Sequence, residues 1–216
     1  MQTLSLDKAH LYVVQALDEL KSLEGSTMLG TDELDTKKLV DGYIVEAVLK
    51  SHKDAPSYLL DGKTETAFSS DIQEDLSVKI VMTQESARLV SFKASDSPTV
   101  VTDYAPEESP IGRMQNNKYV RGTYDDPRLI VMKVWAADKK PEYVYYSVKE
   151  KTETGPTFTL EYIPYPEIVD SSVEISDKME YAVLNLLVSM VLDALSLHDK
   201  ATLYRNKYQE YLQTAR

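Results

Sequence analysis

The chain contains no cysteine and little glycine, and both shortages exclude kinds of chemistry. Without cysteine, its 216 residues offer no disulfide framework, no thiol nucleophile and no thiolate metal site. Its seven glycines form neither G-x-x-x-x-G-K-S/T nor G-x-G-x-x-G, the patterns whose backbone amides bind phosphate. A disulfide-stapled secreted domain is therefore excluded, and a backbone phosphate site is not expected.

Residues that usually carry catalysis are also sparse. The three histidines, His10, His52 and His198, have no partner at the four-residue spacing that places two imidazoles on one helical face. No G-x-S-x-G nucleophile elbow occurs, and the acidic clusters lack the twelve-residue calcium loop with its central glycine. We therefore expect a protein that is not an enzyme and that holds no cofactor or metal. A metal-independent hydrolase ranks third, because no nucleophile–base pair can be assembled from these motifs.

Positive charge is in short supply as well. Lysine and arginine number 24 against 35 aspartates and glutamates, which leaves a net charge of −11. Neutralising DNA phosphates requires clustered lysine and arginine, so a surface that grips DNA is not expected. Acidity favours solubility, and it would also suit a wall that nucleic acid passes without sticking. Composition does not choose between these two meanings.

The most apolar run, AVLNLLVSMVLDALSL at 182–197, is too short for a membrane span of about 20 apolar residues. It also carries Asn185, Ser189 and Asp193. The opening MQTLSLDKAHLYVV has no basic region ahead of an apolar run, so no secretory signal is expected. A short helix that is apolar almost all round is typical of a protein core. We expect no membrane contact.

Helical periodicity marks both ends of the chain. Apolar residues at helical spacing predict a first helix between the N-cap Ser5 and the stop Gly25, and a second helix from the cap Thr31 to about residue 54. Two amphipathic helices joined by a short loop predict an antiparallel hairpin. Helical spacing returns after residue 175, first to Leu197 and then, after a bend with Asp199 as candidate cap, to the last residues.

The middle of the chain alternates with a period of two. Residues 57–75 are polar and irregular, so a linker or exposed loop is expected there. Strands are predicted at 76–83 and 87–94. The runs 128–136, 143–151 and 157–163, separated by turn residues, predict a meander of consecutive antiparallel strands. Prolines 164 and 166 then end the sheet.

This layout predicts an α+β fold, an antiparallel bundle of about four helices from both termini with an inserted antiparallel β-sheet domain. The expected parts are an N-terminal helical hairpin (1–56), a β insertion with loops (57–166) and C-terminal helices that complete the bundle (167–216).

Three further patterns have more than one interpretation. Asp125 and Asp126 beside Arg128 could form a buried ion pair, although turn chemistry before a proline is the preferred explanation. Trp135 is expected in the core, and as a carbohydrate platform it would need an exposed face. The last helix carries a stripe of aromatic residues that either packs on the bundle or docks to another chain, because tyrosine suits a boundary between dry and wet surroundings. The stripe consists of Tyr204, Tyr208, Tyr211 and Leu212.

Residues 157–216 resemble the C-terminal part of head–tail connector proteins of podovirus-type tailed phages, including those of crAss-like phages. The run begins TFTLEYIPYPEIVDSSVEIS and ends YRNKYQEYLQTAR. The family's C-terminal part has this order: a strand, a crossover marked by prolines, a helix of small and apolar residues, a short acidic break, and a final helix with spaced aromatic residues. NNKYVRGTYDDPRLIVMKVW is similar to the strand-entry segment of the β insertion in such proteins.

This resemblance implies a structural virion protein of the neck or tail, assembled in the host cytoplasm. Such proteins form a closed ring of identical subunits, commonly a dodecamer, which joins the capsid portal to the next tail protein and extends the DNA channel without binding DNA specifically. By the same resemblance, portal or neighbouring-subunit contact is expected at Tyr204, Tyr208, Tyr211 and Arg216. The alternative is a β-sheet binding module of a phage tail or cell-surface assembly that recognises a ligand or glycan.

Overall fold

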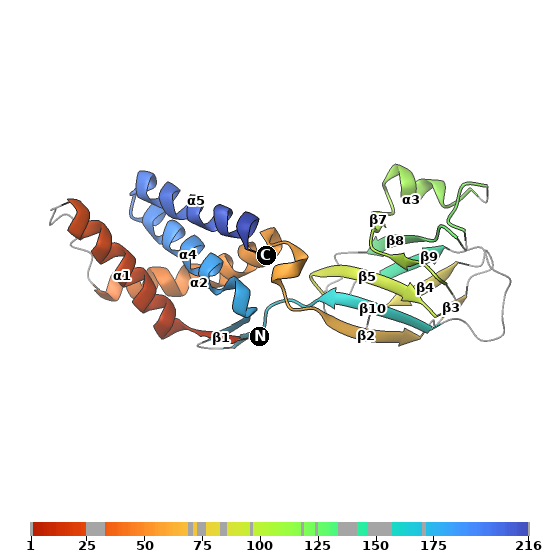
Figure 1. Ribbon diagram of the computed structural model, residues 1–216, viewed down its shortest axis with the longest axis horizontal. Helices are drawn as coiled ribbons and strands as arrows, with labels where there is room; N and C mark the ends of the chain where they lie inside the picture. The colour runs from red at the N-terminus through yellow and green to blue at the C-terminus, as the bar shows by residue number, and fades with distance from the viewer. Residues whose placement is uncertain are drawn as a thin grey trace. The chain divides into compact units, whose positions relative to one another are not determined.

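The chain divides into two compact units in the structure, which is a computed structural model (Figure 1). The helical unit comprises Met1–Asp61 and Pro166–Arg216, and the β unit comprises Gly62–Tyr165. Gly25, Thr31, Trp135 and Arg216, for which the sequence predicts roles, lie outside the residues that the structure describes. It describes residues 2–24, 33–68, 71–72, 77–82, 86–95, 97–117, 119–123, 125–133, 142–146, 157–169 and 172–215.

The helical unit is organised around helix α4, whose sequence is the most apolar of the chain. Every side chain from Ala182 to Ser189 is buried, and the buried amide of Asn185 donates to the Tyr181 carbonyl at 2.7 Å. Helices α1, α2 and α5 each pack against α4. In chain order the unit contains β1 (Gln2–Ser5), α1 (Leu6–Glu24), α2 (Glu33–Asp54), η1 (Ser57–Leu59), β11 (Ile168–Val169), β12 (Ser172–Ile175), η2 (Asp177–Met179), α4 (Glu180–Ala194) and α5 (His198–Thr214).

The predicted antiparallel four-helix bundle is wrong, and only the class α+β holds. In a closed bundle each helix packs against two neighbours around a shared core. Here α4 is apolar almost all round, so the other helices pack onto it, and α5 packs principally on α4 (Figure 1). A three-stranded sheet, in the order β1-β12-β11, belongs to the same unit. The inserted part also differs from the expected antiparallel sheet, because its described residues form two sheets, one of which contains the parallel pair β7 (Ala105–Pro106) and β8 (Arg128–Lys133).

The small sheet joins the two ends of the chain. Strand β1 pairs antiparallel with β12, from Gln2 opposite Ile175 to Ser5 opposite Ser172. The sequence predicted no strand after the prolines and none before the first helix, because runs of two to four residues are too short to show alternation. The predicted cap of α1 is confirmed, since the Ser5 hydroxyl oxygen accepts from the backbone N–H of Lys8 at 3.3 Å.

A left-handed residue separates α4 from α5. The bend was predicted at residues 198–200, but α5 already begins at His198 and the break is at Leu195–Leu197. Ser196 has φ 61°. Its N–H donates to the Asp193 carbonyl at 3.0 Å, and the Leu197 N–H donates to the Leu192 carbonyl at 2.9 Å. This is the Schellman arrangement, with serine in the place that glycine usually takes.

The Asp193 carboxylate links the two helices across this break. His198 Nδ1 lies 3.1 Å from Asp193 Oδ1, and the Arg205 guanidinium donates to Asp193 Oδ2. The histidine, followed by the arginine, lowers the pKa of Asp193. The ionised carboxylate therefore holds the first turns of α5 at the end of α4.

The β unit encloses an aromatic core between two sheets, in the orders β2-β10-β5-β6 and β3-β4-β9-β8-β7. Phe92 and Phe158 of the first sheet stack at 5.1 Å, and both contact Tyr145 of the second sheet at 5.1 and 5.5 Å between ring centroids. In chain order the unit contains β2 (Lys63–Phe68), β3 (Asp71–Ile72), β4 (Val78–Val81), β5 (Arg88–Ala94), β6 (Val100–Val101), β7 (Ala105–Pro106), α3 (Pro110–Met114), β8 (Arg128–Lys133), β9 (Glu142–Tyr146) and β10 (Thr157–Ile163).

Two predictions about this unit need correction. The predicted meander is wrong at its third strand, because β8 and β9 pair with each other whereas β10 lies in the other sheet, between β2 and β5. The expected loop at 57–75 contains η1, β2 and β3. Strand β2 is an edge strand rich in polar residues, so its sequence lacks the hydrophobic alternation of a half-buried strand.

Candidate functional site: an open groove on the helical unit

The structure places the predicted contact tyrosines at different depths. Tyr204 and Tyr208 are 4% and 3% exposed, so both belong to the interior of the helical unit. The Tyr208 hydroxyl donates to Asp54 Oδ2 of α2 at 3.1 Å, and burial, followed by the Asp54 charge, raises the pKa of Tyr208. Tyr211 is half-buried and donates to the Lys178 carbonyl at 2.6 Å. Tyr211 also lines a surface hollow.

That hollow is a groove of about 440 Å³, which we name the α1–α5 groove. Its floor is the buried Leu184 of α4. One wall comes from α1 and the opposite wall from Tyr211 of α5, so the groove follows from the two helices packing on α4 without closing over it. Its lining residues are Lys8, Leu11, Tyr12, Gln15, Asp177, Glu180, Tyr181, Leu184 and Tyr211.

The groove presents apolar and aromatic surface. Leu11 is 59% exposed and lies outside the stripe of buried residues of α1. Tyr181 is also exposed, and its ring packs on the Tyr211 ring at 5.3 Å with an angle of 52°. Aromatic side chains at a partly open surface offer large contact area together with a polar tip, as protein–protein interfaces do.

The groove lining carries two carboxylates and one ammonium group. Glu180 forms an ion pair with Lys8 and accepts a hydrogen bond from the Gln2 amide. Asp177 adds a second carboxylate beside it. Burial, followed by the neighbouring Tyr181 and Tyr204, raises the pKa of Tyr12, so this phenol is neutral at physiological pH. The lining therefore combines apolar surface with an excess of negative charge.

A second exposed apolar surface lies on the β unit. The stretch 109–121, which we name the α3 segment, has four exposed apolar side chains, of which Tyr119 is 83% exposed. Its sequence contains no acidic residue and three basic ones, Arg113, Arg121 and Lys118, of which Lys118 lies outside the described residues, in a chain whose net charge is −11. The four apolar side chains are those of Ile111, Met114, Tyr119 and Val120.

The α3 segment is fixed to the β unit by a buried glutamine and by two glycines. Gln115 donates to the Ile111 carbonyl at 2.9 Å and accepts from the Gly122 N–H at 2.8 Å. A Cβ atom at Gly112 would lie 2.4 Å from the carbonyl oxygens of Pro106 and Glu107. At Gly122 it would lie 2.5 Å from the Tyr146 carbonyl oxygen. Only glycine allows so close an approach of two backbone segments.

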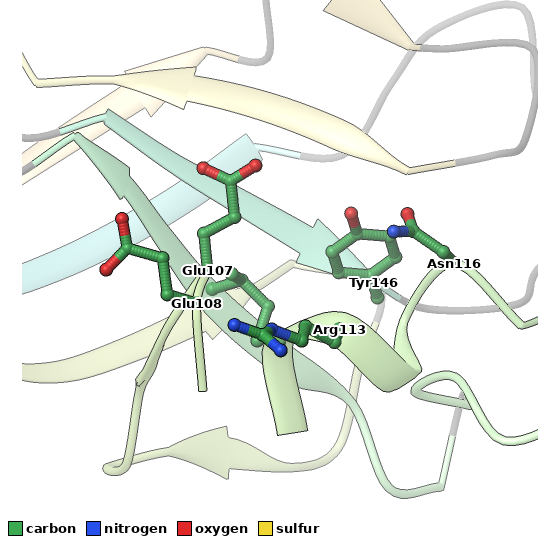
Figure 2. A pocket seen from close by; sticks show the side chains of 7 residues that line it. Glu107, Glu108, Arg113, Asn116 and Tyr146 are labelled. Carbon is green, nitrogen blue, oxygen red and sulfur yellow. The ribbon is translucent and has the colours of Figure 1, made fainter. Parts of the chain in front are cut away.

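A hollow of about 340 Å³ lies at the base of this segment. Figure 2 shows Arg113 near Glu107 and Glu108, with Asn116 and Tyr146 on another side of the hollow. Two carboxylates and one guanidinium give it charges of both signs, so it does not select an ion of either sign. No pair of nucleophile and base is formed by these side chains.

The remaining sequence candidates take structural positions. Arg128 forms an exposed ion pair with Asp126 at 2.6 Å, and the Asp126 N–H donates to the Thr123 hydroxyl at 3.2 Å. The pair exists but is not buried, and a turn accompanies it. Within the described ranges, His10 pairs with Asp41 at 2.8 Å, no cluster of three potential metal ligands occurs, and no helix combines the length and hydropathy of a membrane span.

Comparisons with known proteins add no relative. No protein-family model matches the chain, and no curated protein matches it. The groove and the α3 segment are therefore interpreted from their own chemistry. Sequence reasoning missed both surfaces, although Leu11, an apolar residue off the buried stripe of its helix, and the acid-free stretch 109–121 were visible signals.

Proposed function

We propose that the chain is a structural virion protein that forms a homo-oligomeric ring, joining the capsid portal to the tail and extending the DNA channel. Its partners are copies of itself, the portal protein and the next tail or ring protein. The protein has no catalytic role in this proposal. The resemblance of its C-terminal run to head–tail connector proteins is the starting point.

The observation that carries the proposal is the presence of two different exposed apolar surfaces on two units of one chain, the α1–α5 groove and the α3 segment. A ring of identical subunits uses heterologous contacts, in which each subunit presents two different faces. A symmetric dimer would need one self-complementary face instead. Two unlike surfaces therefore favour closed or open head-to-tail assembly.

The charge distribution supports the same role. The helical unit carries 19 acidic and 11 basic residues, whereas the β unit carries 16 and 13. Acidic surface repels phosphate, and an acidic wall lets DNA pass without the salt-dependent binding that lysine and arginine clusters cause. The helical unit is thus the better candidate for a channel lining.

Mass photometry of the purified protein over a range of concentrations, alone and with a purified portal ring of the same phage, tests this function. We expect closed oligomers, visible as rings by negative-stain electron microscopy, or a stoichiometric layer of the protein on the portal. A strict monomer that joins neither itself nor a portal ring would overturn the proposal.

The alternative is a binding module that recognises a ligand or glycan through the β-sheets. It predicts glycan binding by the protein that Trp135→Ala abolishes. No described feature of the two sheets favours it over assembly.

A further inference from the structure

We propose that the α3 segment of one copy docks into the α1–α5 groove of a second copy, and that this contact links neighbouring subunits head to tail. The inference rests on the proposed ring and names the surfaces that build it. It commits to another copy of this chain as the occupant of the groove.

The two surfaces match in the kind of side chain they present. The groove offers the apolar Leu184 as its floor and two aromatic side chains, the exposed Tyr181 and the half-buried Tyr211. The segment offers exposed Ile111, Met114 and Tyr119. Burying such side chains together removes apolar area from water, which is the main favourable contribution to protein association. Aromatic residues and methionine are also enriched in interface cores.

The two surfaces are also opposite in charge. The described residues of the α3 segment include Arg113 and Arg121 and no carboxylate, and the nearest acidic side chains, Glu107 and Glu108, lie at its base. The groove lining carries Asp177 and Glu180 against the single Lys8, and the unit that bears it has eight more acidic than basic residues. Complementary potentials speed encounter and fix the orientation of the partners.

The segment is pre-organised for docking. Gln115 links Ile111, near the start of the segment, to Gly122, just after it, and the close backbone approaches at Gly112 and Gly122 hold the described residues against the β unit. A rigid segment loses little conformational entropy on binding, so more of the contact energy appears as affinity. The exposed side chains are therefore presented on a fixed scaffold.

Every copy carries both surfaces. In an assembly of copies, each groove and each α3 segment is therefore covered without a further partner. There are two competing arrangements. In one, the α3 segment occupies the groove of its own chain, and in the other, only a different protein occupies the groove. Each of them gives a different result in the cross-linking experiment.

The absence of cysteine makes disulfide cross-linking a clean test. Leu11→Cys and Met114→Cys are made as two separate proteins, mixed and oxidised mildly. We expect a covalent heterodimer of one copy of each, reversible by reductant, which no contact within one chain can produce. The double variant Leu11→Cys with Met114→Cys should give a ladder of dimers, trimers and larger species.

A matched control uses Leu203→Cys in place of Leu11→Cys. Leu203 is an exposed leucine of α5 outside the groove lining. Mixed with Met114→Cys, it should give at most a small fraction of the heterodimer. Equal cross-linking from both positions would show random collision and would overturn the inference.

Charge exchange gives a second, independent readout. Arg113→Glu should lower oligomer formation at least about tenfold at low salt, because it places a carboxylate against the two carboxylates of the groove lining. Adding Asp177→Arg should restore it. Lys93→Glu makes the same reversal of charge at an exposed position of β5. It should leave the amount of oligomer within about twofold of the parent protein.

The outcomes separate the inference from the function on which it rests. Oligomers that persist without the heterodimer would show that the ring uses other faces. Cross-linking confined to single chains of the double variant would show that the segment occupies its own groove. Absence of any oligomer, alone or with the portal, would remove the ring as well.

Discussion

The helical unit and the β unit reach a stable core in different ways. In the helical unit one element, α4, is buried along most of its length and the other helices pack against it. In the β unit the core is shared among strands of two sheets, with Phe92, Phe158 and Tyr145 at their junction. The stability of a core centred on one helix depends on the packing of that helix. Such a core also leaves an open surface wherever the covering helices do not meet. The α1–α5 groove is such a surface.

The largest expected effect breaks the helical core at its centre. Leu187→Asp introduces an unpaired charge at a fully buried position of α4. Its cost is several kcal/mol, about the whole stability of a domain. Hydrogen exchange followed by mass spectrometry should show loss of protection in α1, α2, α4 and α5, whereas β4, β5 and β10 keep theirs.

Leu203→Asp is the control for this change, because Leu203 is half exposed on α5. It should leave protection unchanged. Loss of protection in both units of Leu187→Asp would show that the units fold as one cooperative body, and an unchanged melting temperature would contradict the assignment of α4 as the core.

The reciprocal experiment damages the β unit. Phe158→Ala removes a fully buried ring that contacts Phe92 and Tyr145. The expected loss is about 3 to 5 kcal/mol, seen as lost protection in β2, β5 and β10 with the helices unaffected. Val100→Ala, at an exposed position of β6, should cost less than about 0.5 kcal/mol.

A smaller effect distinguishes the tyrosines of α5. Tyr208→Phe removes the hydrogen bond to the Asp54 carboxylate in a buried setting, and we expect a loss of about 1 to 2 kcal/mol in urea denaturation. Tyr211→Phe removes a bond at the groove wall and should cost less than about 1 kcal/mol. The reverse order would contradict the assignment of Tyr208 to the interior.

The smallest expected change is a gain. Ser196→Gly relieves a left-handed backbone conformation between α4 and α5, and should raise stability by about 0.5 to 1 kcal/mol. Ser196→Ala keeps the side-chain penalty and should bring no gain. A thermal melt of the two variants beside the parent measures the difference. Equal stabilities of the glycine and alanine variants would show that the strain is negligible.

Long periodic segments were predictable from the sequence, and short or non-local features were not. The helices that became α1, α2 and α4 repeat apolar residues over several turns, so their existence was visible. The strands β1, β11 and β12 were not visible because two to four residues cannot establish a period. The place of β10 in the other sheet was missed because strand order depends on contacts that no local pattern records.

The candidate site shows the same limit. Spacing along α5 identified Tyr204, Tyr208 and Tyr211 as one stripe, but it could not say which of them the rest of the unit covers. Burial by α4 and the bond to Asp54 place the first two inside and leave Tyr211 at the groove. The groove itself depends on how three helices meet, so no single stretch of the chain predicts it.

The pairing of β1 with β12 also has a consequence for the order of synthesis. Gln2 meets its partner Ile175 only after the ribosome has made residue 175, which follows the whole β unit in the sequence. All strands of the β unit have been synthesised by then, so this unit can complete its sheets while α1 and α2 still wait for α4. The apolar faces of the nascent helices α1 and α2 must therefore stay free of aggregation until α4 has been synthesised.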